Sequence, residues 1–377
     1  MRRLPLISLV LVAVAACSSS DSSDPLANRK TTTPPPDGTS DSPPGPNDTV
    51  PPMQPGTPPP AGMMVTTPAT WPDGYTITGN ITIAAGVTIT IAAGATVTVS
   101  PDVSITVAGT LKGTTSATHA KLAAASGGAW GGLVVASGGS LALDSVDLVN
   151  NKIALWVQKG NADATYANGT ITSAQPFQTE AGSKLSISKS TVTASAASSI
   201  AGTFDASYLT YDKGTSEGIY SSGDTAASLH FADSVLKGMG GGDYLVITNA
   251  ATLKVEYTTI SGSHCPFHFN APGPTSYTID HVSDNTNGWG PMIYGSGAGP
   301  NTITNSNLRD TAWNIDFDNP PGPNGAVTIN GNFFVFPNYD PTKPPGTATN
   351  NPGVRGMPTG TTIAGSLTKA VANAQPR

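Results

Sequence analysis

Charged side chains are scarce in this sequence. They make up 11% of its 377 residues, whereas an average globular protein has about 25%. A helical bundle requires Ala, Leu, Glu and Lys in quantity, so this composition excludes one. Val, Ile and Leu nevertheless recur in short regular bursts, which a disordered chain lacks. The sequence therefore predicts an ordered fold that is not a helical bundle.

Positive charge and cysteine are also in short supply. The chain has 18 basic and 24 acidic residues, for a formal net charge of −6, so nucleic acid is not an expected partner. The two cysteines are Cys17 and Cys265. Because Cys17 is expected to carry lipid, as argued next, Cys265 has no cysteine partner. We therefore predict no intramolecular disulfide.

Residues 1–16 have the layout of a signal peptide. Arg2 and Arg3 precede an apolar run, Leu4–Ala16. This run is shorter than the roughly 18 residues that a membrane-spanning helix needs, but its length suits a signal peptide. No later segment is long and apolar enough to span a bilayer. The chain is therefore predicted to be exported.

The end of the leader, Val14-Ala15-Ala16-Cys17, resembles the lipobox of bacterial lipoproteins. The resemblance implies cleavage before Cys17, a diacylglycerol on its thiol, and a fatty acyl chain such as palmitate on the new amine. Several acyl chains together anchor a protein stably. Ser18 follows where an Asp would favour the inner membrane, so similarity to Gram-negative lipoproteins implies the outer membrane. The alternative is an ordinary secretory leader with an incidental cysteine.

Residues 17–70 are predicted to be a lipidated cysteine followed by a disordered linker. They are rich in Pro, Ser and Thr, with runs such as Pro34-Pro35-Pro36 and Pro58-Pro59-Pro60. Proline favours extended polyproline II segments, so we expect a semi-rigid tether. The alternative, a ligand for a proline-recognition domain, lacks a specific PxxP context.

From Tyr75 onward, apolar residues alternate with Thr and Ala, as expected for short strands. From Leu141 a longer repeat of the form apolar-x-apolar-x-x-small-x-apolar appears. Its second apolar position falls at Phe231, Val255, Ile279 and Ile303, at intervals of 24 residues. The repeat fits Leu141/Leu143/Val146/Leu148, Ala164/Tyr166/Gly169/Ile171, Leu185/Ile187/Ser190/Val192, Gly202/Phe204/Ser207/Leu209, Leu229/Phe231/Ser234/Leu236, Leu253/Val255/Thr258/Ile260 and Asn301/Ile303/Ser306/Leu308. A second apolar burst follows in each repeat, as at Leu155/Val157, Leu245/Ile247, Phe267/Phe269 and Ile315/Phe317.

A constant period without helical segments indicates a β-solenoid, because a repeat of about 23 residues lies in the solenoid range. We predict an all-β, right-handed parallel β-helix over residues 71–336, with 337–377 as a C-terminal cap or loose tail. A two-sheet sandwich would not require a constant coil length. Residues 79–89 and 129–135 resemble coils of the pectin-lyase-like superfamily of β-helix proteins. That superfamily includes lyases, hydrolases, adhesins and proteins without assigned activity, so the resemblance bears on fold more than on function.

The repeat carries few residues suited to chemistry. The pair Arg309-Asp310 is best explained as a surface ion pair. In the segment His264–His268, Cys265 should face inward and both histidines outward, because alternate residues of a strand point to opposite faces. The three side chains would then not converge on one ion. We therefore predict no catalytic residues, no cofactor and no metal site.

One low-specificity candidate surface remains on the last coils. Two outward columns are predicted to hold His268, Met292 and Asp316, and Asn270, Tyr294 and Asp318. Aromatic rings, amides and carboxylates suit sugars. Asp316 and Asp318 would lie about 7 Å apart along one strand, a geometry compatible with a paired-carboxylate glycosidase. A solvated sheet face is the alternative explanation. The inward column Cys265, Trp289 and Trp313 should fill the interior; the alternative is an outward sugar-stacking platform.

These features together favour a non-enzymatic cell-envelope lipoprotein. Its β-helix, held on a tether, would have a structural or adhesive role or would contact glycans or another envelope component. The alternative is a polysaccharide lyase or glycoside hydrolase of the pectin-lyase-like type. The expected location is the outer membrane through the lipid on Cys17, and both periplasmic and outward orientations stay open.

Overall fold

The computed structural model describes residues 62–160, 162–213, 217–221, 227–238, 242–248, 252–309, 315–317, 325–334, 354–355, 357–365, 367 and 369–377. All of them belong to one compact unit, Pro46–Arg377. The predicted leader, Cys17 and most of the predicted linker lie outside this part of the chain. Among the described residues there is no helix that is long and apolar enough to cross a membrane.

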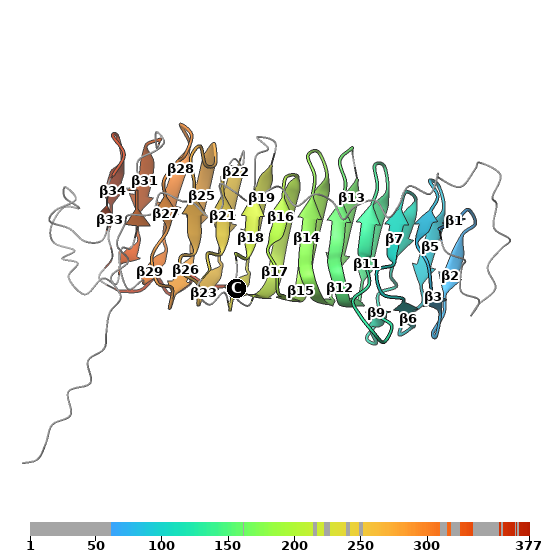
Figure 1. Cartoon of the computed structure of the whole chain (residues 1–377). Helices are drawn as coiled ribbons and strands as arrows, with labels where there is room; N and C mark the ends of the chain where they lie inside the picture. The colour runs from blue at the N-terminus through green and yellow to red at the C-terminus, as the bar shows by residue number, and fades with distance from the viewer. Residues whose placement is uncertain are drawn as a thin grey trace, which may run out of the picture. The chain divides into compact units, whose positions relative to one another are not determined.

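The chain folds as a right-handed parallel β-helix with about 24 residues per turn, which confirms the predicted fold class. Figure 1 shows the coils stacked in sequence order along one axis. Strands of successive coils pair in parallel in three ladders. Four long strands bend at a corner and contribute to two ladders each: β12 (Val146–Val157), β14 (Thr170–Thr179), β15 (Lys184–Ala194) and β17 (Thr203–Lys213).

The first ladder also contains β1 (Met63–Val65), β4 (Ile81–Ile83), β7 (Ser104–Val107), β10 (Gly132–Val135), β16 (Ser198–Ile200), β18 (Ile219–Ser221), β21 (Leu245–Ile247), β24 (Phe267–Phe269), β27 (Met292–Ile293), β30 (Ile315–Asp316) and β33 (Val354–Arg355). The second contains β2 (Ala69–Trp71), β5 (Thr88–Ile91), β8 (Thr110–Lys112), β11 (Ser140–Asp144), β13 (Asp163–Ala167), β19 (Ser228–Ala232), β22 (Thr252–Glu256), β25 (Ser276–Asp280), β28 (Asn301–Thr304), β31 (Val327–Asn330) and β34 (Thr362–Ala364). The third contains β3 (Thr76–Ile77), β6 (Thr96–Val99), β9 (Ala120–Ala124), β20 (Val235–Lys237), β23 (Thr259–Ser261), β26 (Ser283–Asn285), β29 (Asn307–Arg309) and β32 (Phe333–Phe334).

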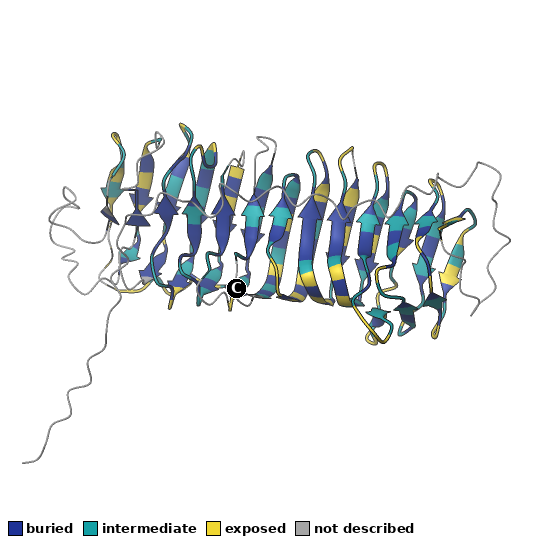
Figure 2. Ribbon diagram, viewed as in Figure 1, coloured by how far each residue is buried: buried dark blue, intermediate teal, exposed yellow. Residues whose placement is uncertain are grey.

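Alternation along each strand places the core inside the coil. In β5 and β6, isoleucine and valine are fully buried while the threonines between them are partly exposed. This is the pattern expected when one face of a strand points inward and the other meets water. Figure 2 shows buried residues along the strands and exposed residues concentrated at the bends.

The predicted repeat register is confirmed over most of the chain. Phe231, Val255, Ile279 and Ile303 pair in sequence from one coil to the next. One repeat was placed wrongly: Phe204 pairs with Leu185 and Leu229, so it occupies the first apolar position. The coil that leads from Leu185 to Phe204 has 19 residues and is shorter than the coils on either side, so a fixed spacing shifts the alignment by two residues.

The strands extend beyond the stretch that the sequence assigned to the β-helix. β1 lies in the predicted linker and β2 begins there, and they pair with β4 and β5. Near the other end, β33 and β34 lie in the predicted cap and add a further rung in parallel register. Both ends of the predicted β-helix are thus extended by strands whose sequences do not follow the repeat pattern.

A left-handed backbone conformation recurs where the second ladder turns into the third. One residue per coil has φ near 50° at this bend. We call the following set the corner column: Tyr208, Asp233, Tyr257, His281 and Asn305. Non-glycine residues adopt this conformation at a cost in free energy. The ladders on both sides of the bend hold them in it. The corner column projects one large or polar side chain per coil.

The Trp-Gly-Gly segment that begins β10 is explained by close backbone contact. Trp130 is fully buried and its indole Nε1–H donates to the Val149 carbonyl at 3.0 Å. Gly132 has φ 119°, and a Cβ there would overlap the Ile153 carbonyl of the next coil. Only glycine allows the two coils to approach at this point.

We predict that Gly132→Ala destabilises the fold by about 3 kcal/mol or more, because strain and overlap with backbone add together. Urea unfolding followed by circular dichroism would measure this. Gly138→Ala is the matched control: its φ is 74°, but nothing lies within 4 Å of an added Cβ, so only the conformational cost of about 1–2 kcal/mol applies. Equal losses in the two variants would contradict the role assigned to Gly132.

Candidate functional site

The structure tests the predicted columns on the last coils. His268 pairs with Met292, and Met292 pairs with Asp316, as the 24-residue spacing predicts. Asn270 and Tyr294 lie two positions after His268 and Met292 on the same coils and are partly exposed. Asp318 and Cys17, the remaining predicted site residues, lie outside the described residues.

Four members of the predicted patch are in contact. His268 Nε2 lies 3.0 Å from Asn270 Oδ1, and its ring packs edge-on against Tyr294 with centroids 5.4 Å apart. The Tyr294 hydroxyl donates to Asp316 Oδ2 at 3.4 Å. Asn270 Nδ2 is buried with no hydrogen-bond partner among the described residues.

The patch is less exposed than the sequence predicted. Asp316 is 1% and Met292 is 7% exposed, so the expectation that both face solvent is wrong. Alternation along a strand predicts which side chains point out of the coil. It does not predict which other residues of the protein cover those side chains. Asp316 therefore supports the Tyr294 hydroxyl rather than offering a free carboxylate, and a glycosidase pair with Asp318 gains no support.

The centre of this region is Asp243, which no sequence pattern identified as a candidate site residue. It precedes β21, one coil before His268. Its Oδ1 accepts from the Cys265 backbone N–H at 3.2 Å and from the Cys265 thiol at 3.0 Å. Oδ1 also lies 3.0 Å from His264 Nδ1, and Oδ2 lies 2.8 Å from His268 Nδ1. We call Asp243, His264, Cys265 and His268 the Asp243 cluster.

The expectation that Cys265 and His268 point apart is wrong. Cys265 Sγ and His268 Nδ1 are 3.9 Å apart, and both contact one carboxylate. Strict alternation applies only within a strand, and β24 begins at Phe267. Pro266 lies between the two side chains and the backbone bends there, so the thiol and the imidazole reach the same point.

Charge in the Asp243 cluster is concentrated on one carboxylate. Burial alone would raise the pKa of Asp243, but its hydrogen bonds with His264, His268 and Cys265 outweigh burial and hold that pKa far below the ordinary value. Asp243 is thus ionised, with its side chain 17% exposed. An ionised carboxylate surrounded by a thiol and two imidazoles is a strong attractor for protons or a cation.

The predicted inward column is only partly interior. Cys265 is fully buried, whereas Trp289 is partly exposed and its ring lies 6.5 Å from the His264 ring. Trp313 falls outside the described residues. The coil interior here is filled instead by Phe267 and Phe269, whose rings lie 6.1 Å apart.

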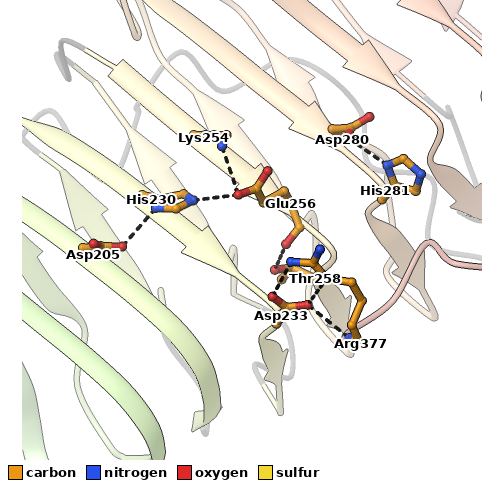
Figure 3. Close-up of polar contacts among 9 residues, drawn as sticks. All are labelled: Asp205, His230, Asp233, Lys254, Glu256, Thr258, Asp280, His281 and Arg377. Atoms are coloured by element: carbon orange, nitrogen blue, oxygen red, sulfur yellow. Dashed lines mark hydrogen bonds and ion pairs between the residues drawn. The ribbon is translucent and has the colours of Figure 1, made fainter. Parts of the chain in front are cut away.

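A second polar region lies on the corner column (Figure 3). Arg377 forms a bidentate ion pair with Asp233, Nε to Oδ1 and Nη2 to Oδ2, both at 2.8 Å. Its guanidinium lies 3.9 Å over the centre of the Tyr257 ring. The hydrogen bonds from Arg377 lower the pKa of Asp233, whose side chain is 4% exposed. Segment 369–377 thereby docks on coils far from it in sequence.

This docked segment forms one wall of an open pocket of about 440 Å³. The pocket is lined by Tyr257, Asn373, Gln375, Pro376 and Arg377. Tyr208, two positions earlier on the corner column, is 48% exposed. None of these residues was selected from the sequence, because their proximity depends on the return path of segment 369–377.

A charged row lies beside the corner column on the second ladder (Figure 3). His230 Nδ1 is 2.9 Å from Asp205 and its Nε2 is 3.1 Å from Glu256, which also accepts from Lys254 Nζ at 2.9 Å. Burial alone would raise the pKa of Glu256. Its hydrogen bonds with Lys254 and His230 outweigh burial, so the pKa lies below its ordinary value. The side chains are 22% to 51% exposed on a sheet face and satisfy one another.

No protein-family model, no curated protein and no solved structure matches this chain.

We predict that Arg377→Ala releases segment 371–377, and that hydrogen–deuterium exchange of its amides will show the loss of protection at neutral pH. In the unchanged protein the depressed pKa of Asp233 means that the ion pair is intact above the ordinary Asp pKa of 3.8. Protection should therefore disappear as pH falls through the lowered value, when Asp233 takes up a proton. Lys237→Ala is the control, because Lys237 and Asp212 form a 3.6 Å pair in which both side chains are 46% exposed. Unchanged exchange in Arg377→Ala would refute the docking role.

Proposed function

We propose that this protein is a lipid-anchored component of the bacterial cell envelope, in which a rigid β-helix on a proline-rich tether contacts glycans without cleaving them. The anchor rests on the lipobox resemblance at Cys17 and the tether on the composition of the linker. The anchor and the tether are both proposed from the sequence. The role of the solenoid is argued below from the described residues.

The use of charged side chains supports a structural body rather than a catalytic one. The paired acids mostly bond to residues about one coil away, as in His119–Asp147 at 3.0 Å and His230–Asp205 at 2.9 Å. Such pairs tie neighbouring coils together on flat sheet faces. This pairing gives the acids a structural role between coils.

The observation that carries glycan contact is the pocket at segment 369–377. Amide groups of Asn373 and Gln375 and the guanidinium of Arg377 offer donors and acceptors to sugar hydroxyls. Tyr208 and Tyr257 stand two coils apart, or about 10 Å at roughly 4.8 Å per coil. The half-exposed Tyr208 ring, two coils from the residue that lines the pocket, and the pocket amides together suit an extended polysaccharide that follows the solenoid axis.

Polysaccharide cleavage is the alternative, and one observation favours it. Lys254, Glu256 and His230 converge on the second ladder beside the same pocket. Their mutual pairing and exposure argue against it, because a cleavage site needs at least one group poised away from its neighbours.

We predict that Tyr208→Ala and Gln375→Ala each weaken binding to the best polysaccharide on a glycan array by about 10-fold, the effect of losing roughly 1.4 kcal/mol. Tyr220→Ala on the first ladder is the aromatic control and should bind as the unchanged protein does. Tyr294→Ala, assayed in parallel, tests the patch predicted from sequence. If no glycan binds, or if all variants bind equally, the pocket is not the contact surface. Release of uronate products that Glu256→Gln abolishes would establish cleavage instead.

We predict that Cys17→Ala moves the protein from the membrane to the soluble fraction and abolishes palmitate incorporation. Several acyl chains provide the anchor, so the loss should be nearly complete. Labelling with a palmitate analogue and fractionation would measure both. Retention of the label or of the membrane association would show that Cys17 is not the lipid site. Protease treatment of intact cells would then distinguish outward from periplasmic display.

A further inference from the structure

We propose that the Asp243 cluster binds a divalent transition-metal ion of the zinc class, with Asp243, Cys265 and His268 as ligands. The site goes beyond glycan contact and uses none of the pocket residues. Thiolate, imidazole and carboxylate are the donor set that zinc prefers in proteins. All three ligand atoms lie within 4.8 Å of one another, and the residues come from two neighbouring coils.

The separations are close to those of a tetrahedral site. With metal–ligand bonds of about 2.0–2.3 Å, ligand atoms lie about 3.4–3.6 Å apart. Here the sulfur and the imidazole nitrogen are 3.9 Å apart, Asp243 Oδ2 lies 2.8 Å from the imidazole nitrogen, and Asp243 Oδ1 lies 3.0 Å from the sulfur. Shifts of about half an ångström would bring these separations to those of a tetrahedral site.

The hydrogen bonding of His268 supports the same conclusion. His268 Nε2 lies 3.0 Å from the side-chain amide of Asn270, which orients the ring. On the other side of the ring, Nδ1 lies 2.8 Å from Asp243 Oδ2 and 3.9 Å from Cys265 Sγ. Nδ1 is therefore the nitrogen that is directed at the other two ligand atoms. A ligand histidine whose other nitrogen donates to a neighbouring oxygen is a frequent arrangement around bound metals.

Charge and proton balance favour the exchange. A divalent ion would displace the proton of the Cys265 thiol to solvent. The resulting thiolate and the ionised Asp243 carboxylate would then neutralise the two positive charges of the ion. No oxidant or further reactant is required.

The same geometry argues against a cysteine nucleophile. In a Cys–His–Asp relay the histidine uses opposite nitrogens for the thiol and the acid. Here Nδ1 of His268 faces both the thiol and Asp243, while Nε2 is occupied by Asn270. A proton relay requires one ring nitrogen for the thiol and the other for the acid, and His268 does not offer them in this way.

His264 stands beside the open position of the site. Its Nδ1 is 3.0 Å from Asp243 Oδ1, and its side chain is 39% exposed. The three proposed ligands leave a fourth position for water or, after a side-chain rotation, for His264.

Cobalt binding to the full-length Cys17→Ala protein tests the proposal, because Cys265 is then the remaining thiol. The protein would be stripped with EDTA under reducing conditions and titrated with Co²⁺. We expect one ion per chain and a sulfur-to-cobalt charge-transfer band that Zn²⁺ displaces. Bound Zn²⁺ should also slow alkylation of Cys265 by iodoacetamide at least 10-fold. A folded protein that shows no such band and no protection would overturn the proposal.

Variants then assign the ligands, with circular dichroism to verify folding. Cys265→Ser should abolish the band, and His268→Gln or Asp243→Asn should weaken Co²⁺ binding more than 10-fold. Asn270→Ala, which keeps all three ligands, should weaken it about 10-fold. His281→Gln is the matched control: His281 and Asp280 form a 2.8 Å pair of similar exposure that includes no thiol. An unchanged band in Cys265→Ser, or a loss in His281→Gln equal to that in His268→Gln, would also refute the site.

Discussion

The backbone ladder between successive coils is the interaction on which the rest of this structure depends. Every described strand pairs in parallel with strands one coil before and one coil after, or at one side only at the ends. A single coil cannot satisfy its own backbone groups or close its own core, so it is stable only when it is stacked. The spacing that the ladder imposes, about 4.8 Å, also decides which side chains meet.

That spacing explains why so much of the fold was predictable from the sequence. Inward positions must be apolar at a constant interval, and Phe231, Val255, Ile279 and Ile303 preserve this interval. Where coil length changes, as at Phe204, the same reasoning misplaces a repeat by two residues. The spacing predicts columns reliably only while the bends between strands keep a constant length.

The polar sites were less predictable because they form where the chain leaves the strands. The column of His268, Met292 and Asp316 followed from the period, but the burial of Asp316 did not. Asp243 and Cys265 stand at the same offset before β21 and β24, but the coil between them has 22 residues, since Leu245 pairs with Phe267. A fixed interval of 24 therefore does not align the two. The docking of Arg377 on Asp233 joins residues 144 positions apart. The repeat pattern predicts contacts between neighbouring coils and does not predict a contact over this sequence separation.

The ladder also gives a physical reason why the Asp243 cluster can concentrate so many ionisable groups. Residues one coil apart are held at a separation set by the backbone, so their side chains meet without the loss of freedom that loops would suffer on ordering. Elsewhere in the solenoid, pairs such as Asp280 with Thr304, at 2.6 Å, use this arrangement to tie two coils together. The Asp243 cluster differs because the bend at Pro266 turns a buried thiol toward the same carboxylate as the imidazole. The backbone therefore holds three different donor atoms around one point, and this is the preorganisation that a binding site requires.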